Sequence, residues 1–364
     1  MLKKRNSGID CLRILCMVYI VLVHYVGFGG ISPADPDSKF PVVSSAMQML
    51  VICAVNCFGM ISGYVGYTEK KKPHAFYGYA SLWLEVAFYG LLPYLVCLAL
   101  GISVGWKDCL KALFPLTTNV YWYFTAYTPL FFLMPFLNDC IRGSSRQQLV
   151  KVCLVLAVLF SGISVSNDSF WLHNGYSFAW LLYLYLVGAT LKKCNVAEKI
   201  STSHAFAGIL ILWGLRTLLH LYGPDWTVFI FRLRRSQLTA FTDPSTLLLS
   251  VLHIIAFAGL KIPSDKLRKV IDLAAPRTFS VYLLNTHPVI WPYFVMNVFA
   301  GHRVDNLFLL VCQLVAMSCI FVIVSILIDM LRKKLFDLLQ VNLLAKKAEA
   351  LADACLARWL PDEE

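Results

Sequence analysis

The stretch RNSGIDCLRILCMVYIVLVHYVGFGG, residues 5–30, is long and apolar enough to cross a lipid bilayer as one helix. It nevertheless carries Asp10 and Arg13 near its start and His24 near its end. Ionisable groups in the hydrocarbon core cost roughly 2.5–3.5 kcal/mol each on insertion scales, so they indicate a functional site. The run is too long for a cleavable signal peptide and lacks a small-residue cleavage site, so we expect a retained first membrane helix.

The rest of the chain has a similar composition. Of its 364 residues, 59% are apolar and 15% are charged, whereas soluble domains carry roughly a quarter charged residues. The net charge of +11 comes from short basic clusters between apolar runs, which is the pattern of cytoplasmic loops and not of a nucleic-acid groove. The 12 Cys form no CxxC pair and no Cys/His cluster with zinc spacing, so we expect neither a disulfide framework nor a metal site.

These patterns predict an all-α fold, a polytopic bundle of about ten transmembrane helices. With the N-terminus inside, most of the 32 Lys and Arg residues fall in the inner segments, so both termini are predicted to be cytoplasmic. We divide the chain into a membrane domain, 1–336, and a cytoplasmic amphipathic tail, 337–364, which we expect to lie on the inner membrane surface. The predicted spans are 9–28, 44–66, 79–100, 121–139, 149–164, 175–191, 204–222, 244–260, 273–298 and 307–330.

The charged residues of the first span share one face. Asp10 and Arg13 form an i,i+3 pair, and Arg13 and His24 are only about 20° apart around the helix and about 16 Å apart along it. Geometry alone leaves two interpretations open. Asp10 and Arg13 could be an interfacial ion pair with His24 bonded to a neighbouring helix, or the face could carry a reaction.

Other polar groups also fall within the predicted spans. Glu85 needs a cation or a proton as a partner inside the bilayer. His253 lies near a span end, where we expect interfacial water to satisfy it. His287 precedes Pro288 and Pro292, which we expect to break the ninth span next to a cavity.

Two classes of function remain open from these residues. The chain has no GxSxG, phosphate-binding glycine loop or HExxH motif, so an enzyme would have to use its intramembrane His, Arg, Glu, Asp and Tyr residues. Interior charges and a broken helix also suit a transporter or flippase for a glycan or lipid intermediate, although no paired broken helices in two related halves are evident. A non-catalytic membrane sensor domain is a further alternative.

Several motifs, in order along the chain, resemble those of acyltransferase family 3. They are R-x10-H in the first span, FGMISGYVGY at 58–67, YWYFTAYTPLFFLMPFLN at 121–138, GYSFAWLLYLYLVGATLKK at 175–193, FSVYLLNTHPVI at 279–290 and SILIDMLRKKLF at 325–336. The likeness extends from about residue 5 to residue 336. Members of this family are integral membrane O-acyltransferases, many of which acetylate bacterial surface polysaccharides.

The resemblance implies that His24 is the catalytic histidine and that Arg13 is its partner in the motif. It also implies cytosolic acetyl-CoA as the acyl donor, a glycan hydroxyl as the acceptor, and a multi-pass protein of a bacterial plasma membrane surrounded by lipid. We expect His24 to act as general base, Arg13 to attract the phosphates of the acyl-CoA and Asp10 to hold Arg13. We expect five further residues to bind the substrates: Glu85, Ser62, Trp122, Tyr123 and His287.

The chain departs from the family pattern at two positions. Relatives often carry an Arg-rich stretch where this chain has EKKKPHAFYGY, residues 69–79, and lysine lacks the bidentate fork of arginine. Relatives also often have a histidine where Asn285 stands, which puts a role for the nearby His287 in doubt. The acceptor sugar, the acyl chain, the oligomeric state and the role of an outward-facing basic cluster at 231–235 stay open.

Overall fold

The computed structural model describes residues 5–31, 40–71, 75–165, 167–223, 226–228, 231–233, 235–300 and 306–359. The longer helices are α1 (Ser7–Phe28), α2 (Pro41–Val51), α3 (Ala54–Gly66), α4 (Tyr77–Ala99), α5 (Trp106–Leu113), α7 (Trp122–Gly143), α8 (Arg146–Ala157), α9 (Phe178–Lys193), α11 (Thr202–Tyr222), α12 (Pro244–Ala258), α13 (Asp265–Ala274), α16 (Leu307–Leu338) and α17 (Val341–Trp359). Shorter helices and turns are α6 (Pro115–Thr118), α10 (Val196–Lys199), α14 (Phe279–Asn285), α15 (Trp291–Phe294), η1 (Val158–Gly162), η2 (Ile163–Val165), η3 (His173–Gly175), η4 (Arg235–Thr239) and η5 (Ala275–Arg277). One antiparallel hairpin joins β1 (Trp226–Val228) and β2 (Phe231–Leu233).

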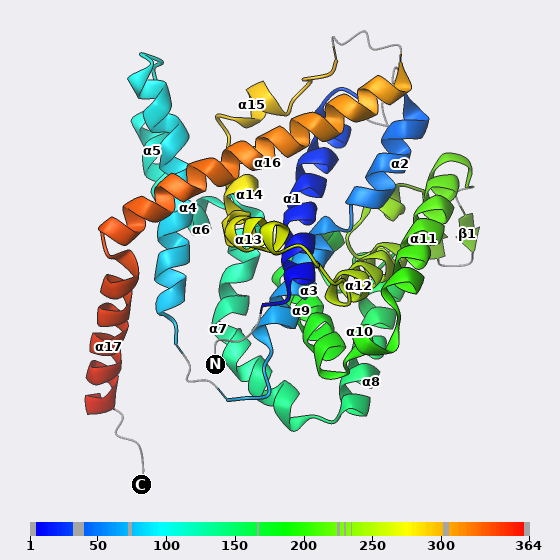
Figure 1. The fold of residues 1–364 in the computed structure, drawn as a ribbon, viewed down its shortest axis with the longest axis horizontal. Coiled ribbons are helices and arrows are strands. Elements are labelled where there is room, and N and C mark those ends of the chain that lie inside the picture. Colours follow the sequence, from blue (N-terminus) through cyan, green and yellow to red (C-terminus); the bar gives the residue numbers. More distant parts are fainter. Residues whose placement is uncertain are drawn as a thin grey trace.

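The fold confirms the predicted all-α membrane architecture (Figure 1). Within the described ranges, six segments are long and apolar enough to cross a membrane, so the predicted count of about ten is not confirmed. Of the other four predicted spans, the fourth is α7, a 22-residue helix with two prolines inside it. The fifth passes from α8 into the π-helical turn η1, the sixth, α9, has 16 residues, and the ninth is broken. The six segments are α1, Pro41–Gly66, α4, α11, Ser236–Ala258 and α16.

The ninth predicted span is broken, as its prolines indicate. Helix α14 ends at Asn285, and the chain continues through turns to the four-residue α15, with Pro292 in its first turn. Pro288 has no backbone N–H to donate, so a regular helix cannot continue through this stretch. The break places His287 and Asn285 at the end of α14, inside the bundle.

Helices α3 and α9 pack closely against each other in the centre of the bundle (Figure 1). A Cβ on Gly63 would lie 1.9 Å from the carbonyl oxygen of Tyr185, and one on Gly188 would lie 1.9 Å from that of Met60. Only glycine therefore permits this backbone contact. The FGMISGY and LVGA segments that carry the family resemblance are thus the two sides of one helix interface.

Helix α17 folds back alongside α4 at the edge of the molecule (Figure 1). The Glu349 carboxylate accepts hydrogen bonds from the backbone N–H groups of Phe76 and Tyr77, where α4 begins. An anionic side chain is favourable at a helix N-terminus because the first N–H groups lack partners there. The predicted tail is therefore helical and docked on α4, and its position on a membrane surface stays a prediction.

Candidate active site

Helix α1 positions the three charged residues that the sequence singles out. It begins at Asn6, whose side chain accepts a hydrogen bond from the backbone N–H of Ile9, and an N-cap of this kind fixes where a helix starts. The buried Asp10 carboxylate pairs with Arg5 Nε at 3.0 Å and with Arg13 Nη1 at 3.4 Å. The predicted i,i+3 pair is confirmed, and one carboxylate between two guanidinium groups leaves a net single positive charge at this end of α1.

His24, just over three turns beyond Arg13, forms a hydrogen bond with the last residue of α14. Its Nδ1 forms a short hydrogen bond with Oδ1 of Asn285, which is fully buried. Since the amide oxygen accepts, Nδ1 carries the proton and Nε2 keeps its lone pair. The imidazole also packs edge-on against Trp291 of α15, with ring centroids 5.1 Å apart. The broken ninth span therefore supplies both Asn285, the hydrogen-bond partner of His24, and Trp291, the ring that packs against it.

The His24 ring faces a cavity of about 340 Å³, near the lower end of typical ligand pockets. We call it the His24 cavity. Eight of its 17 lining residues are Phe, Trp or Tyr, and these include Trp122 and Tyr123, both predicted substrate-binding residues. Apart from the aromatic residues, the polar residues in the lining are His24, Gln48 and Thr239. The lining residues are Met17, Ile20, Val23, His24, Gly27, Phe28, Gln48, Ile52, Val55, Phe58, Trp122, Tyr123, Tyr176, Thr239, Phe241, Phe279 and Tyr282.

A second cavity, of about 360 Å³, contains Arg13 and Ser62. We call it the Arg13 cavity. Three aromatic residues, Phe58, Tyr123 and Phe279, line both cavities. They come from α3, α7 and α14, and we refer to them as the aromatic partition. The face of α1 that carries Arg13 and His24 thus borders two adjoining chambers that share one wall.

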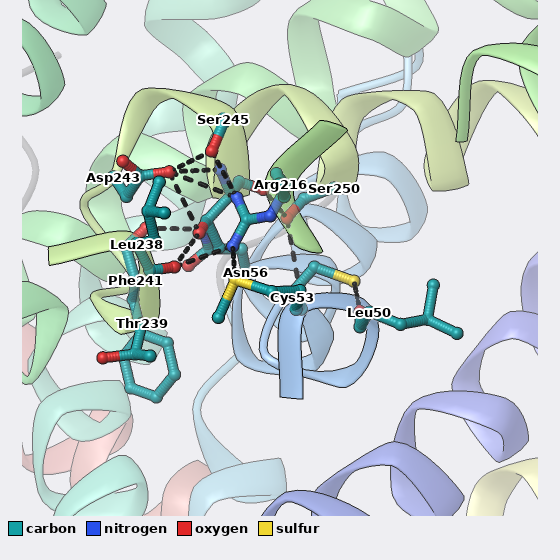
Figure 2. Close-up of polar contacts among 12 residues, drawn as sticks. Leu50, Cys53, Asn56, Arg216, Leu238, Thr239, Phe241, Asp243, Ser245 and Ser250 are labelled. Atoms are coloured by element: carbon teal, nitrogen blue, oxygen red, sulfur yellow. Dashed lines mark hydrogen bonds and ion pairs between the residues drawn. The ribbon is translucent and has the colours of Figure 1, made fainter. Parts of the chain in front are cut away.

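Buried polar contacts hold the segment that carries Thr239 and Phe241 (Figure 2). Arg216, fully buried in α11, donates to the Asp243 carboxylate at 3.1 Å and to the Leu238 carbonyl at 2.7 Å. The Asn56 amide donates to the Phe241 carbonyl at 2.8 Å and accepts from the Trp180 indole at 2.9 Å. Because Thr239 and Phe241 line the His24 cavity, these bonds fix one part of its wall.

Glu85 lies outside the linings of both cavities. Its carboxylate is 3.5 Å from Arg332 Nη2 of α16, and Arg332 Nε donates to Asp329 at 2.6 Å. The cation that Glu85 needs inside the bilayer is therefore Arg332. A role for Glu85 along the substrate path stays a prediction.

His287 lies in the turn between α14 and α15, two residues beyond Asn285. Its Nδ1 accepts from the Val289 N–H, and its Nε2 donates to the Gly90 carbonyl, both at 3.0 Å. It lines a third cavity of about 200 Å³ together with Tyr94 and Tyr121. Both ring nitrogens are satisfied by backbone groups, and a substrate-binding role for His287 also stays a prediction.

Sequence reasoning missed two features of this site. It noted Asn285 only as a departure from the family pattern, whereas the structure makes it the hydrogen-bond partner of His24. It also expected His253 to be solvated at a span end, which is wrong, because α12 buries the side chain to 2% exposure. The side chains of the basic cluster at 231–235 lie outside the described residues.

Fold and site together define a helical membrane protein with a half-buried histidine that lines a cavity rich in aromatic residues. Residues 6–330 match the model of the acyltransferase domain called Acyl_transf_3, nearly the whole chain. The chain therefore belongs to acyltransferase family 3, as its motifs indicate. In comparisons with curated proteins and with solved structures, nothing matched.

Proposed function

We propose that this membrane acyltransferase moves an acetyl group from cytosolic acetyl-CoA to a hydroxyl group of a cell-surface polysaccharide or a lipid-linked glycan. The observation that supports it best is the pair of adjoining cavities along α1, one with a cation and one with a histidine. A bacterial plasma membrane, with the Arg13 end of α1 facing the cytosol, is the location that fits this proposal.

In this mechanism Arg13 binds a phosphate of the donor, because a guanidinium stays protonated and matches phosphate geometry. The residual positive charge beside Asp10 adds to this attraction. The pantetheine arm then passes the aromatic partition, so that the thioester reaches the His24 cavity. Donor and acceptor approach from opposite ends of the same helix face.

His24 acts as the general base through Nε2. It takes the proton of the acceptor hydroxyl while the oxygen forms a bond to the thioester carbonyl carbon. The carbon–sulfur bond then breaks, and the proton passes to the leaving CoA sulfur, which regenerates the neutral imidazole. The hydrogen bond to Asn285 keeps a proton on Nδ1, so Nε2 is free to take the hydroxyl proton at the start of each cycle.

The test is acetyl transfer by membranes that contain the protein. Isotope-labelled acetyl-CoA is supplied on the cytosolic side, and mass spectrometry of the glycan fraction measures acetyl groups gained relative to membranes without the protein. His24→Ala should lower the transfer rate by roughly 10²- to 10⁴-fold, the usual contribution of a general base. His204→Ala, at the exposed start of α11, is the matched control and should transfer at the normal rate.

Two outcomes would contradict the proposal. Wild-type membranes that leave the glycan mass unchanged would refute acetyl transfer to glycans. Normal transfer by His24→Ala protein, at equal abundance in the membrane, would refute the role of His24.

A further inference from the structure

A cluster of soft metal ligands lies behind the wall of the His24 cavity. The Cys53 and Cys57 sulfur atoms and a ring nitrogen of His253 lie within 4.8 Å of one another. The distance from Cys53 Sγ to His253 Nδ1 is 3.9 Å. All three side chains are buried, with 0–2% of their surface exposed. We propose that they bind one zinc ion, at a site separate from the acyl-transfer chemistry.

Cys16 of α1 supplies the fourth ligand. Its thiol is fully buried beside this cluster but lies outside the group of three ligand atoms within 4.8 Å of one another, so Cys16 completes the set only by turning its side chain toward the ion. The set is then three sulfur atoms and one imidazole, which is one of the usual tetrahedral zinc sets. These ligands come from α1, the α2–α3 junction, α3 and α12, so no spacing rule along the chain could reveal them.

The chemistry of the ligands favours zinc over harder cations. Thiolate and imidazole groups select zinc among the divalent metals that cells supply, whereas magnesium and calcium require oxygen ligands. Each coordinating thiol loses its proton when the ion binds. Two thiolates and a neutral imidazole bring the charge of the site to zero, and a third thiolate at Cys16 lies one turn from Arg13, whose positive charge offsets it. An almost neutral complex suits a low-dielectric interior.

The surroundings are those of a rigid site. Helices α2 and α3 are separated by a break at Ile52 and Cys53, and Ile52 lines the His24 cavity. The His253 ring bonds to the Leu249 carbonyl at 2.8 Å and stacks with Phe257. The ring atom in that bond is Nδ1, the same nitrogen that lies 3.9 Å from Cys53 Sγ, so zinc at Nδ1 would replace the bond to Leu249. Zinc would therefore tie α1, α3 and α12 together behind the cavity wall.

The competing state is a cluster of metal-free thiols. Cys53 can donate to the Leu50 carbonyl at 3.2 Å (Figure 2), and Cys57 lies 4.0 Å from the Ser250 carbonyl. The experiment must separate this state from the zinc site. It measures metal and needs no acyl-transfer assay, so its failure would leave the proposed function standing.

The test uses the full chain, purified in detergent, loaded with zinc and desalted. Elemental analysis should find about one zinc per chain in the wild type and less than roughly a tenth of that in Cys53→Ser/Cys57→Ser or His253→Ala protein. Cys97→Ser/Cys319→Ser, which removes two thiols elsewhere, is the matched control and should keep its zinc. Wild-type protein without stoichiometric zinc, or equal loss in the control, would overturn the proposal.

Cobalt substitution of the wild-type chain gives a second measurement that needs no variant to fold. A tetrahedral thiolate site should show an intense sulfur-to-cobalt charge-transfer band together with strong visible bands. Absence of the charge-transfer band in cobalt-loaded protein would refute thiolate ligation. Cys16→Ser should weaken the band by about a third if three thiolates contribute, and an unchanged band would refute Cys16 as the fourth ligand.

Discussion

The Arg13 cavity and the His24 cavity are nearly equal in volume, about 360 and 340 Å³, and share the aromatic partition. Their polar groups differ. One cavity has a permanent cation held by a carboxylate, and the other has an imidazole held by an amide. A fixed charge can bind an anionic donor but cannot take a proton, whereas a histidine can. The comparison indicates that α1 separates donor binding from proton transfer.

After the loss of His24 itself, the largest effect should come from removing the Arg13 cation. Arg13→Ala should lower kcat/KM for acetyl-CoA on the order of 30- to 5,000-fold, because it removes the guanidinium that pairs with the donor phosphate, and truncating one partner of a hydrogen-bonded charge pair typically costs about 2–5 kcal/mol. Most of the loss should be in KM, measured by initial rates at varied donor concentration. Arg13→Lys keeps the charge and should recover part of the affinity. An unchanged KM for acetyl-CoA in Arg13→Ala protein would contradict donor binding in the Arg13 cavity.

The next effect concerns the group that holds the histidine. Asn285→Ala removes the acceptor for Nδ1, and a lost hydrogen bond worth about 1–3 kcal/mol corresponds to a loss of roughly 5- to 150-fold in kcat. The donor KM should not change, since Asn285 is not in the lining of the Arg13 cavity.

Two variants separate positioning from packing in this experiment. Thr286→Val alters the neighbouring residue, whose hydroxyl bonds only within α14, and should keep the normal kcat. Asn285→His restores an acceptor and should recover part of the rate and the pH profile of kcat. A parallel loss of kcat and donor affinity in Asn285→Ala would argue against a positioning role.

The third test addresses the wall between the cavities. Phe279→Ala should raise acetyl-CoA hydrolysis in the absence of acceptor by roughly three- to tenfold, because an opened partition admits water to the thioester. Phe131→Ala is the matched control: it truncates the same type of half-buried side chain but lines only the Arg13 cavity. Release of free CoA thiol measures the hydrolysis. Equal hydrolysis by both variants would show that the partition does not exclude water.

The sequence alone predicted the helical membrane fold, the i,i+3 pair of Asp10 and Arg13, and the broken ninth span, because these follow from composition, helix period and proline chemistry. It could not predict partners far apart along the chain. Asn285 meets His24 across 261 positions, and His253 meets Cys53 across 200. Such pairs are set by how helices pack, and glycine contacts such as Gly63 on Tyr185 decide that packing.

The smallest effect on activity should come from the charge network between α4 and α16. In Glu85→Gln protein, Arg332 keeps its 2.6 Å bond to Asp329, which also accepts from the Tyr89 hydroxyl at 2.9 Å. The free energy of unfolding should therefore fall by about 1–3 kcal/mol, as for one lost hydrogen bond to a charged group. The acetyl-transfer rate should change by less than about twofold, because Glu85 lies outside both cavities. Thermal unfolding in detergent and initial rates measure the two quantities. A tenfold or greater loss of rate at unchanged stability would instead place Glu85 on the substrate path. The path would then extend beyond the Arg13 and His24 cavities.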